Sequence, residues 1–232
     1  MRHNRRMALL GPAALLLSFD VAPEAIAGHD DWHTREHLPE RLSIPGFLRG
    51  TRWTALRGAP RYLVVYEVAS LATLSSPAYL ERLNHPTPWT STVMASYRGM
   101  RRAFCTVAGS AGHGLGGTGR LIRFAPPAAG AEGLRDWLVR TALPALAARA
   151  GLGSAHLFEP AAAPAMTREQ RIRGADAELG CAILVTGHDE DALERVAEAG
   201  VGARALHARG ATDVVDATYR LHYALLREEL RA

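Results

Sequence analysis

The strongest constraint on the fold is an internal repeat. Residues 31–39 read Asp-Trp-His-Thr-Arg-Glu-His-Leu-Pro, and residues 136–144 read Asp-Trp-Leu-Val-Arg-Thr-Ala-Leu-Pro. Five of these nine positions are identical at a constant offset of 105 residues. Self-similarity at one offset indicates a repeated structural unit. The 232-residue chain is therefore expected to contain two copies of one fold.

Both copies show the same order of predicted elements, because β-forming apolar runs alternate with amphipathic stretches in the same sequence. In the first copy we expect strands at residues 13–19, 47–56, 62–68 and 100–107 and helices at residues 23–42 and 75–83. In the second copy we expect strands at residues 118–124, 153–158, 181–186 and 213–226 and helices at residues 131–149 and 189–199. The order β-α-β-β-α-β is that of the ferredoxin-like unit.

This element order predicts the fold class. A four-stranded sheet that carries its helices on one face leaves the other face apolar. Two such sheets can bury these faces against each other. We therefore predict an α+β protein with tandem ferredoxin-like repeats, whose two antiparallel sheets pack face to face as an α/β barrel within one chain.

The repeat also suggests domain boundaries. Residues 1–109 form the first repeat, residues 110–117 a glycine-rich linker, and residues 118–232 a degenerate second repeat. The glycines lack the Lys-Ser/Thr pair of a phosphate-binding loop, and they precede a strand instead of opening a helix. The polar stretch at residues 160–178 is longer than ordinary connections. We expect it to be either a lid or a mobile insertion.

The two copies differ most at ionisable positions. His33, Glu36 and His37 of the first copy correspond to leucine, threonine and alanine in the second. Helical spacings of three and four residues place these side chains on one face. The mostly apolar equivalent face in the second copy is expected to pack on a sheet, so we expect the histidines and Glu36 to point inward. An imidazole beside a carboxylate can exchange protons near neutral pH. The alternative is a solvated polar helix face.

A metal site is the competing interpretation of the same stretch. Residues 33–37 fit the H-x-x-E-H pattern of inverted zinc proteases. Such a site needs a third ligand, and Pro39 would disturb the long helix that carries it. We therefore expect no metal and no cofactor.

Composition excludes several classes of partner. The net charge is +4, all 27 basic residues are arginine, and they are scattered without an aromatic-interleaved basic stripe. We expect no nucleic acid as a partner. No apolar run reaches the roughly eighteen residues of a membrane span, so we expect no membrane partner. Cys105 and Cys181 lie in apolar, strand-like runs and are expected to be buried, not disulfide-bonded.

The N-terminus allows two interpretations. Three arginines precede an apolar run, and residues 25–27 resemble a cleavage site, so residues 1–27 could be a signal peptide. Cleavage there would remove the first predicted strand of the first repeat. We therefore favour a mature strand and a cytoplasmic protein.

Residues 13–109 resemble a known family. The stretch W-x-x-x-E-H-x-P-E-R (residues 32–41) is followed by Pro-Gly-Phe at residues 45–47, by Arg49 and Arg52, and later by Pro-Thr-Pro-Trp at residues 86–89. These features are similar to the dimeric α/β-barrel superfamily, in its EthD-like branch. The resemblance implies a pocket between helices and sheet. Superfamily members include polyketide cyclases, lactone isomerases, dehydratases, cofactor-free monooxygenases and haem enzymes.

Our first functional hypothesis is a cofactor-independent enzyme that acts on a small organic molecule by acid–base proton transfer, as a dehydratase, cyclase or isomerase. His37 would be the general base or acid, Glu36 or Glu40 would orient it, and His33 would be a second proton carrier.

The same hypothesis assigns the substrate-binding residues. Arg41 and Arg52 could hold a carboxylate or enolate, because guanidinium groups bind such anions in a fork geometry. Tyr66 and Trp89 could line the pocket, although packing is the ordinary role of such side chains. Trp32 has a twin in the second copy, Trp137, and is therefore expected to be a core residue.

Two alternatives stay open at this stage. The barrel could be a non-catalytic small-molecule binder or an interaction scaffold. It could also be a monooxygenase without cofactor or a haem enzyme of the same superfamily, with His156 or His207 as the axial ligand. In each case the partner is a small molecule, and the protein is a monomer with an intrachain barrel or a homodimer.

Overall fold

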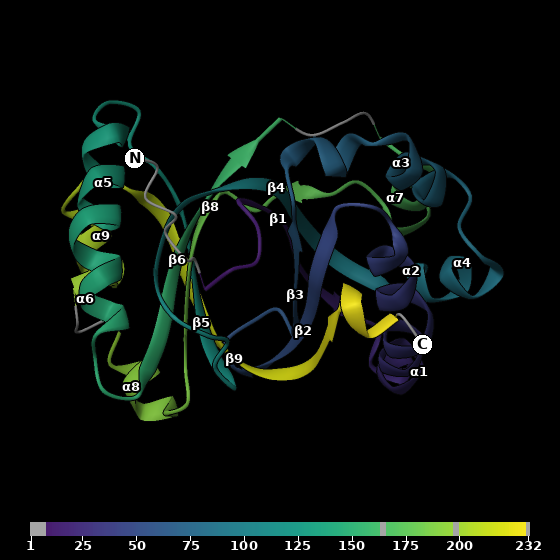
Figure 1. Cartoon of the computed structure of the whole chain (residues 1–232), viewed down its shortest axis with the longest axis horizontal. Coiled ribbons are helices and arrows are strands. Elements are labelled where there is room, and N and C mark those ends of the chain that lie inside the picture. Colours follow the sequence, from purple (N-terminus) through teal and green to yellow (C-terminus); the bar gives the residue numbers. More distant parts are fainter. Residues whose placement is uncertain (1–7, 163–165, 197–199, 231–232) are drawn as a thin grey trace.

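The computed structural model describes residues 8–162, 166–196 and 200–230 and shows a closed barrel of eight antiparallel strands with helices outside it (Figure 1). The order around the barrel is β1-β3-β2-β9-β5-β8-β6-β4, and β4 pairs with β1 to close it. The α+β barrel fold is thereby confirmed. The strands are β1 (Ala13–Val21), β2 (Phe47–Arg57), β3 (Tyr62–Val68), β4 (Tyr97–Gly112), β5 (Thr118–Ala125), β6 (Leu152–Ala161), β8 (Cys181–Gly187) and β9 (Thr212–Leu226), with a short edge strand β7 (Ala177–Glu178) beside β4.

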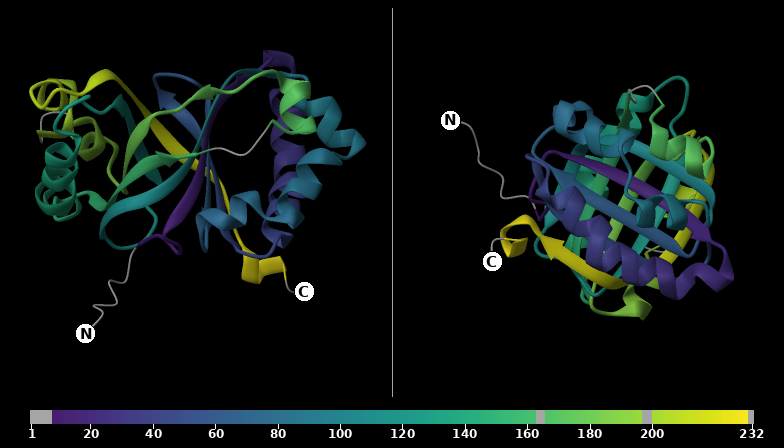
Figure 2. Two further views of the ribbon diagram at one scale, coloured as in Figure 1. Left: turned by 90° about the horizontal axis from the view of Figure 1, so that it is seen from above. Right: turned by 90° about the vertical axis from the view of Figure 1, so that its right-hand side faces the viewer.

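The helices lie at the two ends of the molecule, one group for each repeat (Figures 1 and 2). The first group is α1 (Ile26–Trp32), a π-helical turn (His33–His37), α2 (Leu38–Ser43), α3 (Pro77–Asn84) and α4 (Pro88–Met94). The second is α5 (Ala131–Trp137), a π-helical turn (Leu138–Ala142), α6 (Leu143–Ala147), α8 (Glu190–Glu194) and α9 (Ala203–His207). One helix crosses over: α7 (Arg168–Arg173) follows β6 of the second repeat but lies among the helices of the first (Figure 1).

The two sheets are joined along both edges. Strand β2 pairs with β9, and β4 pairs with β6, so hydrogen bonds connect the repeats on both sides of the barrel. This arrangement leaves neither sheet with long unpaired edges there. It also carries β4 through Gly112, beyond the expected start of the linker at residue 110. The proposed domain division stays a prediction, because the barrel interior is shared by both repeats.

The shared residues of the repeat encode the same helix irregularity twice. In each copy a π-helical turn separates two short helices, and the backbone N–H of Leu38 donates to the carbonyl of His33, five residues earlier. Leu143 and Leu138 repeat this bond in the second copy. Pro39 and Pro144 follow directly. A proline ring clashes with the carbonyl four residues before it, and a π turn relieves the clash.

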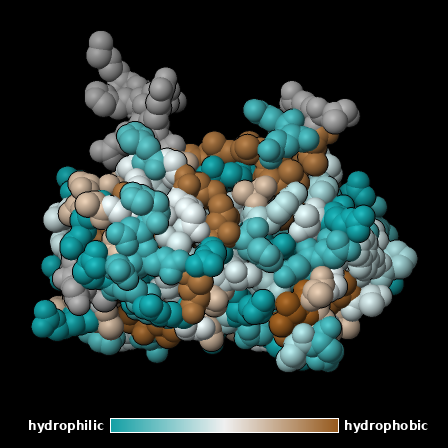
Figure 3. All heavy atoms as spheres, turned by 90° about the horizontal axis from the view of Figure 1, so that it is seen from below, coloured by the Kyte–Doolittle hydropathy of each residue, from teal (hydrophilic) through white to brown (hydrophobic). Residues whose placement is uncertain are grey.

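Three apolar clusters hold the structure together. One fills the barrel interior and includes Trp53, Leu121 and Phe158 from both repeats. The other two lie between each sheet and its own helices. Gly50 of β2 sets the helix position in the first repeat, since a Cβ there would come within 2.4 Å of Leu38 Cδ2. The barrel surface is mostly hydrophilic, with apolar residues gathered near the middle of the face seen in Figure 3.

The structure bears on the two interpretations of the N-terminus, a signal peptide or a mature strand. Arg2, Arg5 and Arg6 lie outside the described residues, whereas Ala13–Val21 is the strand β1, paired on both sides with β3 and β4. Among the described helices, none combines the length and apolar character that crossing a membrane requires.

Candidate active site

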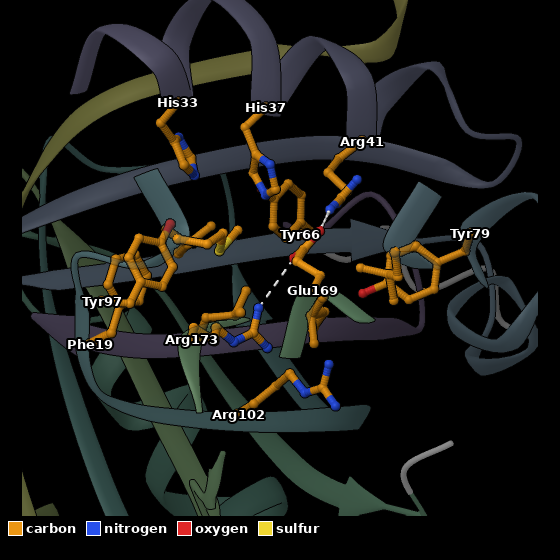
Figure 4. A pocket seen from close by; sticks show the side chains of 15 residues that line it. Phe19, His33, His37, Arg41, Tyr66, Tyr79, Tyr97, Arg102, Glu169 and Arg173 are labelled. Atoms are coloured by element: carbon orange, nitrogen blue, oxygen red, sulfur yellow. Dashed lines mark hydrogen bonds and ion pairs between the residues drawn. The ribbon is translucent and has the colours of Figure 1, made fainter. Parts of the chain in front are cut away.

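A small cavity lies between the sheet of the first repeat and its helices. The side chains of His33, His37 and Arg41 point into it from the long helix, and Tyr66 faces them from β3 (Figure 4). Aliphatic and aromatic side chains of β1 and β3 form the floor. The cavity volume is about 20 Å³, which is room for roughly one or two water molecules. The cavity is therefore too small for an aromatic ligand in this conformation.

His33 and His37 are buried, and the Nδ1 atom of each ring lacks a hydrogen bond to any described residue. Their exposed fractions are 1% and 6%, and their ring centroids lie 5.4 Å apart. Within the described residues, the Nδ1 atom of each ring has no hydrogen-bond partner. A buried polar atom without a partner is costly and calls for an explanation, such as a catalytic role or an unseen water or ligand. The inward orientation expected from the sequence is what the structure shows.

Burial keeps both imidazoles neutral. It lowers the pKa of His33 and of His37 well below the ordinary value, and the positive charge of Arg41 lowers the pKa of His37 further. A neutral imidazole with a free nitrogen can accept a proton from a bound molecule. The low dielectric of the site makes such a proton transfer sensitive to nearby charges.

This burial predicts acid sensitivity. The unfolded chain binds protons at these histidines near pH 6.5, whereas the folded chain resists protonation. Stability is therefore full above about pH 6.5 and falls as the pH drops below it, by at most about 2 kcal/mol per imidazole at pH 5. We expect the double variant His33→Asn/His37→Asn to lose less free energy of unfolding between pH 7.5 and 5 than the wild type. Urea unfolding at both pH values measures this. Equal losses in both proteins would contradict it, and His85→Asn at an exposed position is the control.

A third histidine extends the row away from the cavity. His29 is fully buried, and its ring centroid lies 5.5 Å from that of His33. Its Nδ1 lies 3.2 Å from an Asp30 carboxylate oxygen, and its Nε2 lies 3.3 Å from the hydroxyl of Tyr97. Both nitrogens of His29 are thus engaged, unlike those of the two histidines in the cavity.

Glu36 serves a different purpose from the one expected. Its Oε1 accepts hydrogen bonds from Thr87 Oγ1 at 2.6 Å, Thr90 Oγ1 at 3.0 Å and Trp32 Nε1 at 3.1 Å. These contacts tie the π-helical turn to α4. The structure shows no hydrogen bond from Glu36 to His37, so its role as orienting partner stays a prediction that this geometry does not favour.

The zinc interpretation gains nothing from the geometry. Among residues 8–162, 166–196 and 200–230, no three or more His, Cys, Asp or Glu side chains are grouped so that they could hold a metal ion. The carboxylate of Glu36 is engaged by Trp32 and two threonines, so it does not complete a ligand set with the histidines.

A chain of alternating charges crosses one side of the cavity. It runs Glu40–Arg41–Glu169–Arg173–Asp176–Arg102. Although burial lowers it, the carboxylates of Glu169 and Glu40 raise the pKa of Arg41 overall. Burial raises the pKa of Glu40, and Arg41 opposes this change. Arg41 and Glu40 are thus brought together, as members of an ion network.

The remaining predicted residues divide between the cavity and other places. Tyr66 lines the cavity, and its buried hydroxyl has no partner among the described residues. Arg52 does not line it. Its guanidinium donates to the backbone oxygen of Asp30 at 3.0 Å and to Thr34 Oγ1 at 3.0 Å. Trp89 is 38% exposed on α4 and lies away from the cavity.

Three charged cavity residues escaped the sequence reasoning: Arg102, Glu169 and Arg173. The last two belong to α7, inside the stretch at residues 160–178 that was expected to be a lid or mobile. Their only sequence signal is the spacing of four residues between a glutamate and an arginine in a polar insertion. Nothing local shows that α7 reaches the first repeat.

Comparison with known proteins bears on the fold. No protein-family model matches the chain, and no curated protein matches it. An anthrone oxidase-like protein of known structure is 15% identical, with a TM-score of 0.69 over 95% of this chain and 94% of that one. A Fusobacterium nucleatum protein provisionally named a monooxygenase is 10% identical, with a TM-score of 0.61 over 94% and 96%. A mutant chlorite dismutase from Candidatus Nitrospira defluvii, in complex with cyanide, is 10% identical, with a TM-score of 0.53 over 97% and 94%.

These likenesses concern the architecture. The α/β barrel of the ferredoxin-like type is shared along nearly the whole chain. The EthD-like branch suggested by the motif stays a prediction, since none of the comparisons tests it. None of these three similar structures is named as a lyase or an isomerase. They are named as an anthrone oxidase-like protein, a monooxygenase and a chlorite dismutase.

Proposed function

We propose that the protein is a cofactor-independent oxygenase that oxidises an aromatic-fused ketone or phenol of the anthrone type. The observation that supports this most is the pair of neutral, buried histidines with unpartnered Nδ1 atoms in an aromatic-lined cavity. The proposal keeps the proton-transfer chemistry expected from the sequence. It replaces the expected dehydratase, cyclase or isomerase reaction with oxygenation, in line with the names of the similar structures.

The chemistry needs a base and a donor. In an anthrone, a CH₂ group lies between two aromatic rings, opposite a ketone. In the proposed reaction His37 removes one CH₂ proton, and the electron pair moves onto the ketone oxygen to give an aromatic enolate. The unpaired hydroxyl of Tyr66 donates a hydrogen bond to that oxygen, which stabilises the developing charge.

Dioxygen then acts as the oxidant. The enolate passes an electron to O₂, the two radicals combine at the former CH₂ carbon, and the resulting peroxide takes a proton. Loss of water, with removal of the second carbon-bound proton, leaves a new C=O group. The balance is one CH₂ group and one O₂ converted to one C=O group and one water. His33 is placed to return a proton to the departing oxygen, as the second proton carrier.

A haem version of the function does not fit the described residues. An axial ligand needs a free imidazole nitrogen and space for the macrocycle. His156 lies 2.8 Å from Ser110 Oγ at Nδ1 and 3.1 Å from Ser154 Oγ at Nε2, and burial lowers its pKa to about 4. His207 is exposed on α9. The two larger hollows are lined by no histidine among the described residues.

Oxygen uptake with anthrone tests the proposal. We expect the purified protein in air to consume one O₂ per anthrone and to form anthraquinone faster than the protein-free solution does. An oxygen electrode and the quinone absorbance measure both sides of this balance, and an anaerobic sample is the control. No acceleration with anthrone or its hydroxylated derivatives would overturn the proposal.

A further inference from the structure

The cavity already contains a carboxylate, and it comes from the other repeat. Glu169 of α7 lies between Arg41 and Arg173 (Figure 4). Arg41 Nη2 donates to Glu169 Oε2, and Arg173 Nη1 donates to Glu169 Oε1 at 3.2 Å. The three side chains are only 2–3% exposed. Among the described residues that line the cavity, Glu169 and Arg173 alone come from outside the first repeat.

Docking of α7 offsets positive charge on the first repeat. The barrel and long helix supply Arg41, Arg102 and Glu40, which together carry one positive charge. The α7 segment supplies Glu169, Arg173 and Asp176, which together carry one negative charge. Arg82, half exposed, approaches Glu40 from outside at 3.9 Å and adds further positive charge. His33 and His37 are neutral. Removing α7 therefore leaves Arg41 and Arg102 with Glu40 as their one remaining carboxylate in this network, a positive excess that a replacement anion would neutralise.

Substrate entry requires such a removal. A cavity of about 20 Å³ cannot hold an aromatic ring system. Helix α7 has only six residues, Arg-Glu-Gln-Arg-Ile-Arg, and contacts α3, α4 and β4. Ile172 is its one apolar side chain packed against the core of the first repeat. Its docking thus rests largely on charge pairs, which a ligand carrying the same charge can replace.

We propose that Glu169 occupies the anion site of the substrate, and that the substrate is an aromatic compound carrying a carboxylate that displaces α7 from Arg41. This inference rests on the proposed function for the aromatic part of the substrate. The carboxylate replaces Glu169 on Arg41, while the aromatic rings reach His37 and Tyr66. Arg102, which pairs with Asp176 while α7 is docked, lines the same cavity and adds positive charge there. Without such a ligand, Glu169 keeps the site closed in most molecules, and an aromatic ketone without a carboxylate, such as anthrone, enters only the open fraction.

Binding of a charged ligand and its neutral amide tests the inference. Isothermal titration calorimetry gives the dissociation constants of 2-naphthoate and 2-naphthamide for the wild type and for Glu169→Gln. We expect the wild type to bind 2-naphthoate more tightly than 2-naphthamide. In Glu169→Gln we expect both ligands to bind more tightly, each by about tenfold, the factor expected if Glu169 fills the site in about nine molecules of ten, and the preference for 2-naphthoate to remain.

Two further variants test whether the effect on binding is specific to the charged residues of the cavity. Glu178→Gln removes a carboxylate of the same insertion that is exposed and outside the cavity, and it should leave both affinities unchanged. Arg102→Gln should lower the preference for 2-naphthoate. Circular dichroism confirms that each variant is folded.

The outcomes separate the two proposals. Equal affinities of the wild type for 2-naphthoate and 2-naphthamide would overturn the anion site, as would no binding of either ligand. Unchanged affinities in Glu169→Gln would show that Glu169 does not compete for the site, and would overturn it too. The titration involves no oxygen chemistry. A protein that prefers 2-naphthoate in this way but does not oxidise anthrone would therefore support the anion site while the oxygenase proposal fails.

Discussion

Replacing His37 by asparagine is expected to lower the rate of anthrone oxidation by about 10²- to 10⁴-fold, the usual contribution of a positioned general base. Asparagine keeps a polar side chain of similar reach but cannot accept the substrate proton. The effect should fall mainly on kcat, because asparagine still packs beside the aromatic rings and the proposed contact from Tyr66 to the ketone oxygen is unchanged. Steady-state oxygen uptake gives kcat and KM for both proteins.

Three comparisons make this result decisive. His85→Asn changes an exposed histidine on the same side of the molecule and should keep full activity. His33→Asn should reduce the rate less than His37→Asn if His33 only returns a proton. The opposite ranking would identify His33 as the base. Undiminished activity in both variants would remove the histidines from the mechanism.

The direction of the histidines was predictable because the second copy served as a reference. Leu138 and Ala142 occupy the positions of His33 and His37, and both are buried against the second sheet. Apolar residues at equivalent positions showed which helix face packs inward. The counterpart of Glu36, Thr141, is a polar residue and gave no such direction. Helical spacing alone does not distinguish a side chain that enters the cavity from one that binds a neighbouring helix.

The barrel was predictable for a related reason, and its closure was not. Alternation and β-propensity located most strands within a few residues. The pairing of β2 with β9 and of β4 with β6 depends on which sheet edges remain free after each repeat has formed. The local sequence does not show which of these edges will pair. For the same reason β4 extends to Gly112, where the glycines had suggested a linker.

The position of α7 lay beyond local reasoning altogether. Arg41 and Glu169 are 128 residues apart and become partners only because the insertion after β6 crosses to the first repeat. A short, charged helix with one apolar anchor has no amphipathic pattern that would reveal its docking surface. The docking position of α7 is set by charge complementarity with buried arginines. A single sequence does not show this complementarity.

The twin tryptophans of the repeat should differ sharply in their contribution to stability. Trp32 is fully buried in the core of the first repeat, with its ring centroid 4.4 Å from that of His37. Its Nε1 donates to Glu36 and Thr90. We expect Trp32→Ala to lower the free energy of unfolding by about 3–5 kcal/mol, because it leaves a large cavity and breaks the contacts to α4.

Trp137 is the matched control for this prediction, because it has the same place in the repeat but a different environment. It is partly buried, and the Arg209 guanidinium lies 3.7 Å from its ring centroid. A cation–π contact at such a site contributes about 1 kcal/mol, so Trp137→Ala should cost far less than Trp32→Ala. Urea unfolding of the two variants compares them directly. Equal losses of the free energy of unfolding would mean that the two helices are packed alike. The tryptophan shared by the two copies would then support the repeat fold itself, and not specifically the cavity wall that carries His37.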